Sequence, residues 1–238
     1  MIAGFIVQGP KPKKLLIRGL GPSLPITGAM GDPVLTLFDS TGKQIATNDN
    51  WVTNRDNIIG TQLPPPSSRE SAIVTTLTPG SYTAIVHDQR NQPGLALIET
   101  YDLDPGDSTL ANISTRGTVR SGDDVMIAGF IIGGKNPTNV LVRALGPSLS
   151  KDAVTAPLKD PILEIHDAAG KLIMSNDNWR STQAAKISAT GLAPGNGLES
   201  AIVTALAPGS YTAIVRGQNS STGVALVEVY NLDATPVK

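Results

Sequence analysis

The sequence predicts an all-β protein built from two tandem β-sandwich domains with a jelly-roll-like arrangement. Three observations support this fold class. The apolar residues occur in short runs rich in Val, Ile and Leu, 24 glycines and 18 prolines are spread between the runs, and most of the sequence occurs twice. Short apolar runs between turn residues are typical of β-strands. Aromatic residues make up only 4% of the chain, so the core is expected to be aliphatic.

The duplication defines the domain organisation. Residues 1–6 recur as 126–131, residues 16–24 as 141–149, residues 32–51 as 160–179, and residues 70–86 as 199–215. The offset grows from 125 to 129 residues, and the growth falls in 25–31 and 52–69, between the predicted strands. We therefore expect a first β-sandwich repeat over 1–104 and a second over 105–238.

The strands follow one another in the same order in both repeats. In the first repeat they are expected at 2–7, 15–17, 34–38, 72–76, 82–87 and 95–101. Pro79-Gly80 is a turn dipeptide that joins two of them as a hairpin, and Thr41-Gly42 fits the same role after 34–38. The one helical pattern, 182–187, is too short to change the fold class.

One strand has no counterpart. Residues 108–125 form a leading strand and turn ahead of the second repeat, whereas no matching segment precedes the first. Two explanations remain open: the chain is part of a longer repeat protein, or the first repeat accepts a strand from elsewhere. An unpaired sheet edge invites strand addition. If 108–125 of a neighbouring chain filled it, chains would link head to tail into filaments.

Composition argues against several function classes. The chain has 19 basic and 20 acidic residues and only one short basic patch, at 11–14, so neither nucleic acid nor an anionic membrane surface is an expected partner. It has no cysteine, which rules out thiol catalysis and disulfides. No apolar run approaches the roughly 20 residues of a membrane span, and the apolar start lacks the basic residues of a signal peptide. We expect a soluble chain.

A polar motif repeats in both copies and is a candidate calcium site. Calcium prefers six to eight oxygen ligands, and clustered Asx side chains supply them, with Glu70 or Glu199 as possible additions. The alternative is a structural Asx-rich turn capped by a packed tryptophan. The candidate ligands are Asp39, Asn48, Asp49 and Asn50 in the first repeat and Asp167, Asn176, Asp177 and Asn178 in the second. No other cofactor is expected.

Two charged residues in each repeat lie within apolar strands. Arg18 and Glu99 in the first repeat correspond to Arg143 and Glu228 in the second. A charge in a buried strand needs a partner, so we expect a structural Arg–Glu ion pair between neighbouring strands of each repeat.

No catalytic set is apparent. Ser23 and Ser148 follow a Gly-Pro turn, but a hydrolytic serine needs a histidine base. The two histidines, His87 and His166, align with an arginine and a phenylalanine of the other repeat. We therefore expect a protein that is not an enzyme, although carboxylate pairs are not excluded by sequence.

Trp51 and Trp179 are the only tryptophans and occupy the same position in both repeats. Exposed, they could stack on sugar rings and bind carbohydrate. Packed, they would close the edge of the sandwich, and with so few other aromatics to widen a stacking platform the packed alternative is favoured.

Parts of each repeat resemble the bacterial pre-peptidase C-terminal domain. The resemblance rests on residues 34–43, the turn Asn48-Asp49-Asn50 and the hairpin 77–86; with 111–116 and 142–149 the whole unit is also similar to repeats of large secreted or surface proteins of bacteria. The resemblance implies a β-sandwich appended to exported proteins, sometimes associated with calcium, with adhesive, spacer or targeting roles. This chain departs from the secreted enzymes of that kind because it has no catalytic domain.

The sequence therefore indicates a non-enzymatic structural or interaction protein, extracellular or on the cell surface. We expect it to associate with itself or with other copies of the same repeat, and a filament subunit linked by β-strand donation is one form of such association. The alternative is a carbohydrate-binding or accessory module of a larger secreted enzyme.

Overall fold

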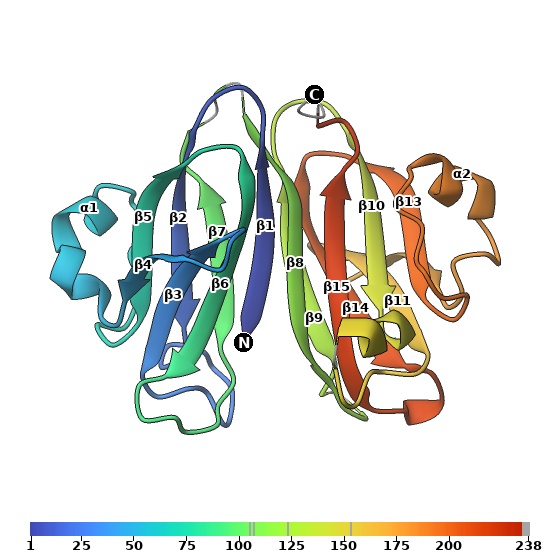
Figure 1. Cartoon of the computed structure of the whole chain (residues 1–238), viewed down its shortest axis with the longest axis horizontal. Coiled ribbons are helices and arrows are strands. Elements are labelled where there is room, and N and C mark those ends of the chain that lie inside the picture. The colour runs from blue at the N-terminus through green and yellow to red at the C-terminus, as the bar shows by residue number, and fades with distance from the viewer. Residues whose placement is uncertain (105, 107, 123, 153, 235–238) are drawn as a thin grey trace. The chain divides into compact units, whose positions relative to one another are not determined.

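The computed structural model describes residues 1–104, 106, 108–122, 124–152 and 154–234. The chain divides into two compact units, Met1–Ala111 and Asn112–Asp233, which are described separately below (Figure 1). The division falls inside strand β8 (Thr109–Val119), a few residues after the boundary that the sequence predicts. Of the residues around that predicted boundary, 105 and 107 lie outside the described part of the chain.

Unit 1 contains two antiparallel sheets. The first has the order β1-β6-β3-β4 and the second the order β5-β2-β7. Gly19 of β2 lies against the first sheet, because a Cβ atom there would come within 2.9 Å of Val86 on β6. The sheets therefore face each other as a sandwich. Their strands are β1 (Ile2–Gln8), β2 (Lys13–Leu20), β3 (Pro33–Asp39), β4 (Gln44–Asn48), β5 (Ser71–Leu77), β6 (Gly80–Asp88) and β7 (Leu97–Asp102).

Unit 2 repeats this architecture with one more strand. One sheet has the order β12-β11-β14-β9, and the other has the order β13-β10-β15-β8. The additional member, β8, pairs with β15 in the second sheet. The remaining strands are β9 (Met126–Ile132), β10 (Thr138–Leu145), β11 (Pro161–Asp167), β12 (Leu172–Asn176), β13 (Ser200–Leu206), β14 (Gly209–Gly217) and β15 (Gly223–Asn231).

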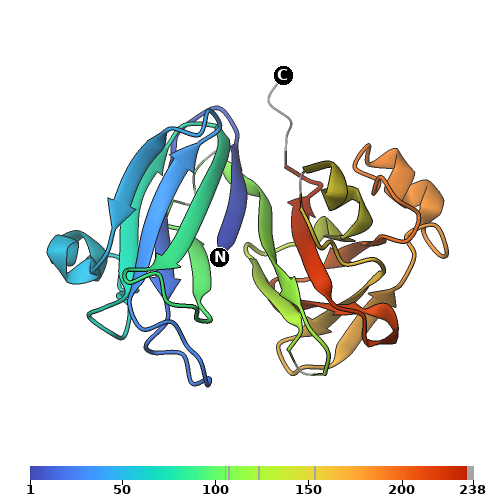
Figure 2. The same ribbon diagram turned by 60° about the horizontal axis from the view of Figure 1, so that its bottom comes forward.

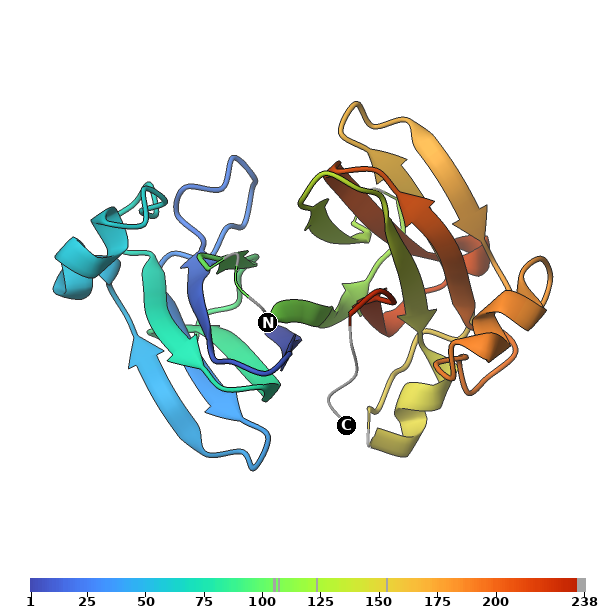
Figure 3. The same cartoon turned by 90° about the horizontal axis from the view of Figure 1, so that it is seen from above.

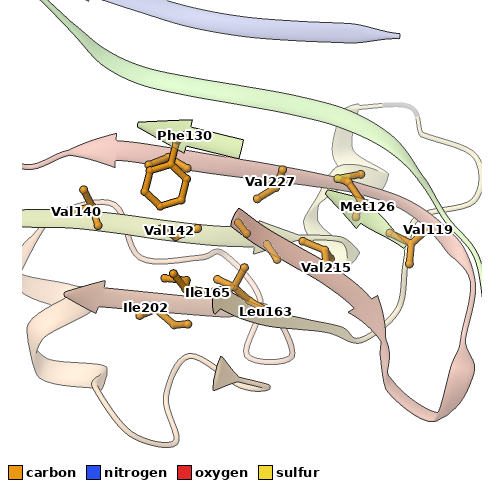
Figure 4. Packing of buried hydrophobic residues seen from close by; sticks show 14 of the residues in the cluster. Val119, Met126, Phe130, Val140, Val142, Leu163, Ile165, Ile202, Val215 and Val227 are labelled. Carbon is orange, nitrogen blue, oxygen red and sulfur yellow. The ribbon is translucent and has the colours of Figure 1, made fainter. Parts of the chain in front are cut away.

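The core between the sheets of unit 2 is aliphatic, as composition predicts. Figure 4 shows Val142, Val227 and Val215 pointing toward Leu163 and Ile165, with Phe130 as the one labelled aromatic ring. Burial of such side chains stabilises the fold by roughly 25 cal/mol per Å² of apolar surface removed from water. Buried residues alternate with partly buried ones along β11 and in the second half of β14, which is the period of two expected of a sandwich strand.

Helices are few and short, which confirms the all-β fold class. α1 (Arg55–Ile59) follows the 3₁₀ turn η1 (Trp51–Asn54) beside β5, and α2 (Ala184–Ala189) lies beside β13 (Figures 1 and 2). Two more 3₁₀ turns, η2 (Pro147–Asp152) and η3 (Gln218–Ser220), belong to unit 2. Viewed from above, each unit separately shows two facing sheets with its helix to the side (Figure 3).

Candidate functional site

Arg18 of β2 and Glu99 of the paired strand β7 form a closed network with Tyr101. Arg18 donates from Nε to Glu99 Oε2 at 2.8 Å, and its Nη2 also bonds to Glu99. The same guanidinium donates to the Leu63 carbonyl at 2.9 Å and to the Tyr101 hydroxyl at 2.9 Å. Tyr101 donates in turn to Glu99 Oε1 at 2.8 Å. This is the Arg–Glu pair that the sequence predicts, extended by a tyrosine.

Unit 2 contains the same network. Arg143 donates from Nε to Glu228 Oε2 at 2.9 Å and to the Tyr230 hydroxyl at 3.0 Å, and it also bonds to the Leu192 carbonyl. Burial, together with the Glu228 charge, raises the pKa of Tyr230 to about 12, so the hydroxyl stays a neutral donor. Because each charge in both networks is held by a partner inside the unit, we assign the networks to stabilising the sheet.

The glutamate that sequence analysis named only as an additional calcium ligand is buried and hydrogen-bonded to two turns of its own unit. Glu70 is 0% exposed. Its Oε1 accepts hydrogen bonds from the Gly21 amide at 3.1 Å, the Ser23 amide at 3.0 Å and the Ser23 hydroxyl at 2.6 Å, and its Oε2 accepts one from the Ser67 amide at 3.0 Å. Glu199 makes the equivalent bonds to Gly146, Ser148 and Asn196. The Gly-Pro-Ser turns of both repeats are therefore held by a carboxylate.

Both tryptophans are packed. Trp51 is 8% exposed and Trp179 is 5% exposed. Trp51 lies in a cluster with Leu16, Ile58 and Ala72, and its Nε1 donates to the Ser67 carbonyl at 2.9 Å. Trp179 makes the equivalent bond to the Asn196 carbonyl at 3.0 Å. The structure therefore shows the packed alternative, and neither indole offers an exposed face on which a sugar ring could stack.

The predicted calcium ligands of the first repeat do not converge. Asp39 caps its own hairpin turn by accepting the Thr41 amide at 2.9 Å and the Lys43 amide at 3.1 Å, and bonding to Thr41 lowers its pKa. Asn48 Oδ1 accepts the Ala72 amide at 2.9 Å, which joins the end of β4 to β5. Asn50 donates its side-chain amide to Asp49 Oδ2 at 2.9 Å.

The second repeat places its candidates in the same way. Asp167 accepts the Ala169 and Lys171 amides, each at 2.9 Å, and Asn176 Oδ1 accepts the Ala201 amide at 3.0 Å. The Asn178 carbonyl accepts a bond from the Asn176 side chain at 3.1 Å. Within the described ranges no group of three or more His, Asp or Glu side chains is placed to hold a metal ion.

One pair of aspartates in each unit has a buried carboxylate oxygen without a hydrogen-bond partner in the described part of the chain. Asp32 Oδ1 and Asp49 Oδ1 are buried and have no hydrogen-bond partner among the described residues. Burial, with the nearby charge of Asp32 as the second cause, raises the pKa of Asp49. Asp160 and Asp177 form the equivalent pair, and burial followed by the Asp177 charge raises the pKa of Asp160. Sequence analysis singled out Asp49 and Asp177 but missed Asp32 and Asp160, which lie before a proline at the start of a strand in both repeats.

The two units differ most at one sheet edge. In unit 2, β8 covers β15 and pairs with it from Gly223↔Val119 to Tyr230↔Asn112. In unit 1, the counterpart of β15 is β7, which is the last strand of its sheet and pairs with β2 alone among the described residues. The missing leading strand predicted by the sequence therefore leaves a strand edge without a partner in the described part of unit 1.

Equivalent side chains are more exposed on β7 than on β15. Val227 and Val229, on the inner face of β15, are 1% and 7% exposed. Their counterparts on β7, Ile98 and Thr100, are only half-buried. Leu97, on the outer face of β7, is 40% exposed. The open edge, defined as residues 97–101, thus carries apolar side chains that are more exposed than their counterparts in unit 2.

Comparison with known proteins identifies no family for this chain. No protein-family profile matches the chain, and no curated protein matches it. Two solved structures are similar over 98% of this chain: the atomic structure of Sulfolobus turreted icosahedral virus (11% identity, TM-score 0.29, 89% of that chain) and the crystal structure of the STIV MCP (14% identity, TM-score 0.30, 98% of that chain). At these TM-scores the similarity supports no functional inference. None of the helices in the described residues is long and apolar enough to cross a membrane.

Proposed function

We propose that the chain is a non-enzymatic structural and interaction module of an extracellular or cell-surface assembly, joined to further repeats of its kind by strand addition at the open edge. The observation that carries this proposal is the contrast between β15, which is covered by β8, and β7, which pairs with β2 alone in the described part of the chain. A strand edge with unpaired N–H and C=O groups is a template for another strand.

The other repeated polar residues support a structural role. Hydrogen-bond partners within unit 1 are found for the side chains of Arg18, Glu99 and Glu70. The hydroxyl of Ser23 donates to the Glu70 carboxylate, which also accepts the amides of Gly21 and Ser67 and so holds the turn in place. Polar residues that stabilise loops and sheets are consistent with a role as a structural or spacer module.

The pairing of β8 within its own unit argues against the expectation that this strand is donated to a neighbouring chain. β8 is already paired with β15 in its own unit, and its Val119 is 0% exposed. Donation of this strand to another chain would open one sandwich for each one it closes. Association through the open edge therefore favours a strand that is not already committed to its own unit.

Sedimentation velocity and electron microscopy over a range of concentrations test this proposal. We expect concentration-dependent association of the purified chain, because open strand edges pair with one another when nothing else covers them. Leu97→Lys, which places a charge on the open edge, should abolish association, whereas Leu172→Lys at an exposed position of β12 should not. A chain that stays monomeric at millimolar concentration, or that associates equally well as Leu97→Lys, would contradict the proposal.

A further inference from the structure

We propose that the open edge of β7 binds an extended strand with the residue pattern of β8, in the register that β8 adopts on β15. This inference rests on the proposed function and names its partner. The partner is a segment of another repeat with small or apolar residues at every second position, as in Thr109–Val119. The chain itself shows what occupies this position, since unit 2 is the same sandwich with the strand in place.

The register follows from the duplication. Residues 95–101 correspond to 224–230, so each β8 residue that pairs with β15 has a defined opposite number on β7. Ile113 pairs with Val229 and would lie opposite Thr100, and Thr115 pairs with Val227 and would lie opposite Ile98. A shift by one residue would turn the apolar side chains of the incoming strand toward solvent.

The inner face of the incoming strand must fit between the two sheets. In β8 this face carries Ala111, Ile113 and Val119, which are buried or packed against the unit 2 core, and Gly117, where a Cβ atom would lie 3.4 Å from the Met126 side chain. The incoming strand is therefore expected to carry small or branched aliphatic residues on this face. In unit 1 the counterpart of Met126 is Met1, which is 46% exposed and would be covered by the same strand.

A polar contact of β8 can also form on β7. Asn112 donates its side-chain amide to the Val229 carbonyl at 3.2 Å. The equivalent acceptor on β7 is the backbone carbonyl of Thr100, which is present whatever the side chain. Backbone pairing supplies affinity in strand addition, and the alternate side chains supply specificity.

Peptide binding to the whole chain tests the inference. The probe is a dye-labelled synthetic peptide with the sequence of Thr109–Val119, and fluorescence anisotropy reports binding. We expect saturable binding that Ile98→Asp in the protein weakens by at least about tenfold, because a charge would be buried under the strand. Ile131→Asp, at a position of β9 that is 71% exposed, is the matched control and should leave the affinity unchanged. A peptide carrying Ile113→Asp should not bind.

Hydrogen exchange of the unsubstituted chain keeps the test independent of the variants. With unlabelled peptide present, amides of β7 should gain protection while those of β15 stay as they are. Protection gained at β15 instead, or no saturable binding up to millimolar peptide, would overturn the inference. Association of the chain that Leu97→Lys abolishes, without peptide binding, would sink this inference and leave the proposed function standing.

Discussion

Glu70 and Glu199 show at the scale of single residues why certain polar positions are kept in both repeats. Each carboxylate is completely buried and accepts hydrogen bonds from three amides and one hydroxyl. These donors belong to turns far apart in the sequence, so one side chain fixes the relative position of two loops. Sequence reasoning found the repeated Gly-Pro-Ser and Glu-Ser motifs but had no means of joining them across about fifty residues.

Glu70→Gln should destabilise unit 1 selectively. The amide group would place a donor where the carboxylate accepts, which costs on the order of 2–3 kcal/mol of unfolding free energy for a buried, charge-assisted site. Each unit contains one tryptophan, Trp51 or Trp179, so fluorine NMR of 5-fluorotryptophan follows the two units separately in urea. The Trp51 midpoint should fall while that of Trp179 is unchanged, and Glu199→Gln should reverse the pattern. Equal midpoints in all three proteins would refute the assignment.

The carboxylate pair Asp32–Asp49 should make unit 1 less stable as pH rises in buffer without divalent cations. The folded state raises the pKa of Asp49, so it holds a proton more tightly than the unfolded chain does. Its contribution to stability is therefore present at low pH and is lost as pH rises through the raised pKa. Asp49→Asn should remove this loss, which sets in as pH rises above about 4, the ordinary pKa of an aspartate, as measured by the Trp51 midpoint in urea. Asp56→Asn, on the exposed α1, serves as control, and an unchanged pH profile in Asp49→Asn would contradict the account.

The two aspartate pairs are the positions at which calcium binding can be tested. A cation bound between Asp32 and Asp49, and between Asp160 and Asp177, would satisfy the buried oxygens and raise Tm, because a ligand that binds only the folded state stabilises it. We expect calcium to raise Tm relative to chelator in the natural chain but not in the Asp49→Asn/Asp177→Asn double variant. An identical Tm in calcium and chelator would remove the hypothesis.

At the scale of elements, the strands were predictable because apolar runs and turn residues fix them locally. The predicted runs 2–7, 34–38 and 82–87 lie within β1, β3 and β6, which extend them by a residue or two. β2, expected at 15–17, begins two residues earlier, at the buried Lys13 that bonds to Asp102 at 2.8 Å, and ends three residues later, at Leu20, which pairs with Leu97 of β7. That extension depends on a partner on another strand, which no local pattern reveals.

The leading strand shows what pairing adds to a local pattern. The sequence indicates a strand and turn over 108–125, of which residue 123 lies outside the described residues, and the structure has β8 at Thr109–Val119. The partner, β15, begins about one hundred residues later in the chain. Sequence reasoning could therefore show that the first repeat lacks the strand, but not which strand edge its absence leaves open.

Val119→Asp should destabilise unit 2 and leave unit 1 intact. Val119 is 0% exposed and belongs to the unit 2 core, so the substitution buries an unpaired charge at a cost of several kcal/mol. The Trp179 resonance should report unfolding at lower urea while the Trp51 resonance does not. Thr118→Asp, at the exposed neighbouring position, is the control. Loss of both units together would show that β8 is not specific to unit 2.

At the scale of the whole molecule, the two repeats are sandwiches with equivalent side-chain networks, and they differ in whether a leading strand covers one sheet edge. Both contain the Arg–Glu–Tyr network, the buried glutamate and the packed tryptophan. Among the described residues, a fourth strand joins the sheet that contains the network in unit 2 but not in unit 1. The features present twice account for folding, and the feature present once is where we expect association.

Hydrogen exchange resolved by residue in the isolated chain tests this account most directly. Amides of β7 that point away from β2 should exchange rapidly, because they have no partner strand, whereas the amides of β15 should be protected on both sides by β10 and β8. Protection should therefore alternate along β7 and be continuous along β15. Protection of β7 as continuous and as strong as that of β15, at a concentration where the chain is monomeric, would contradict an open edge in unit 1.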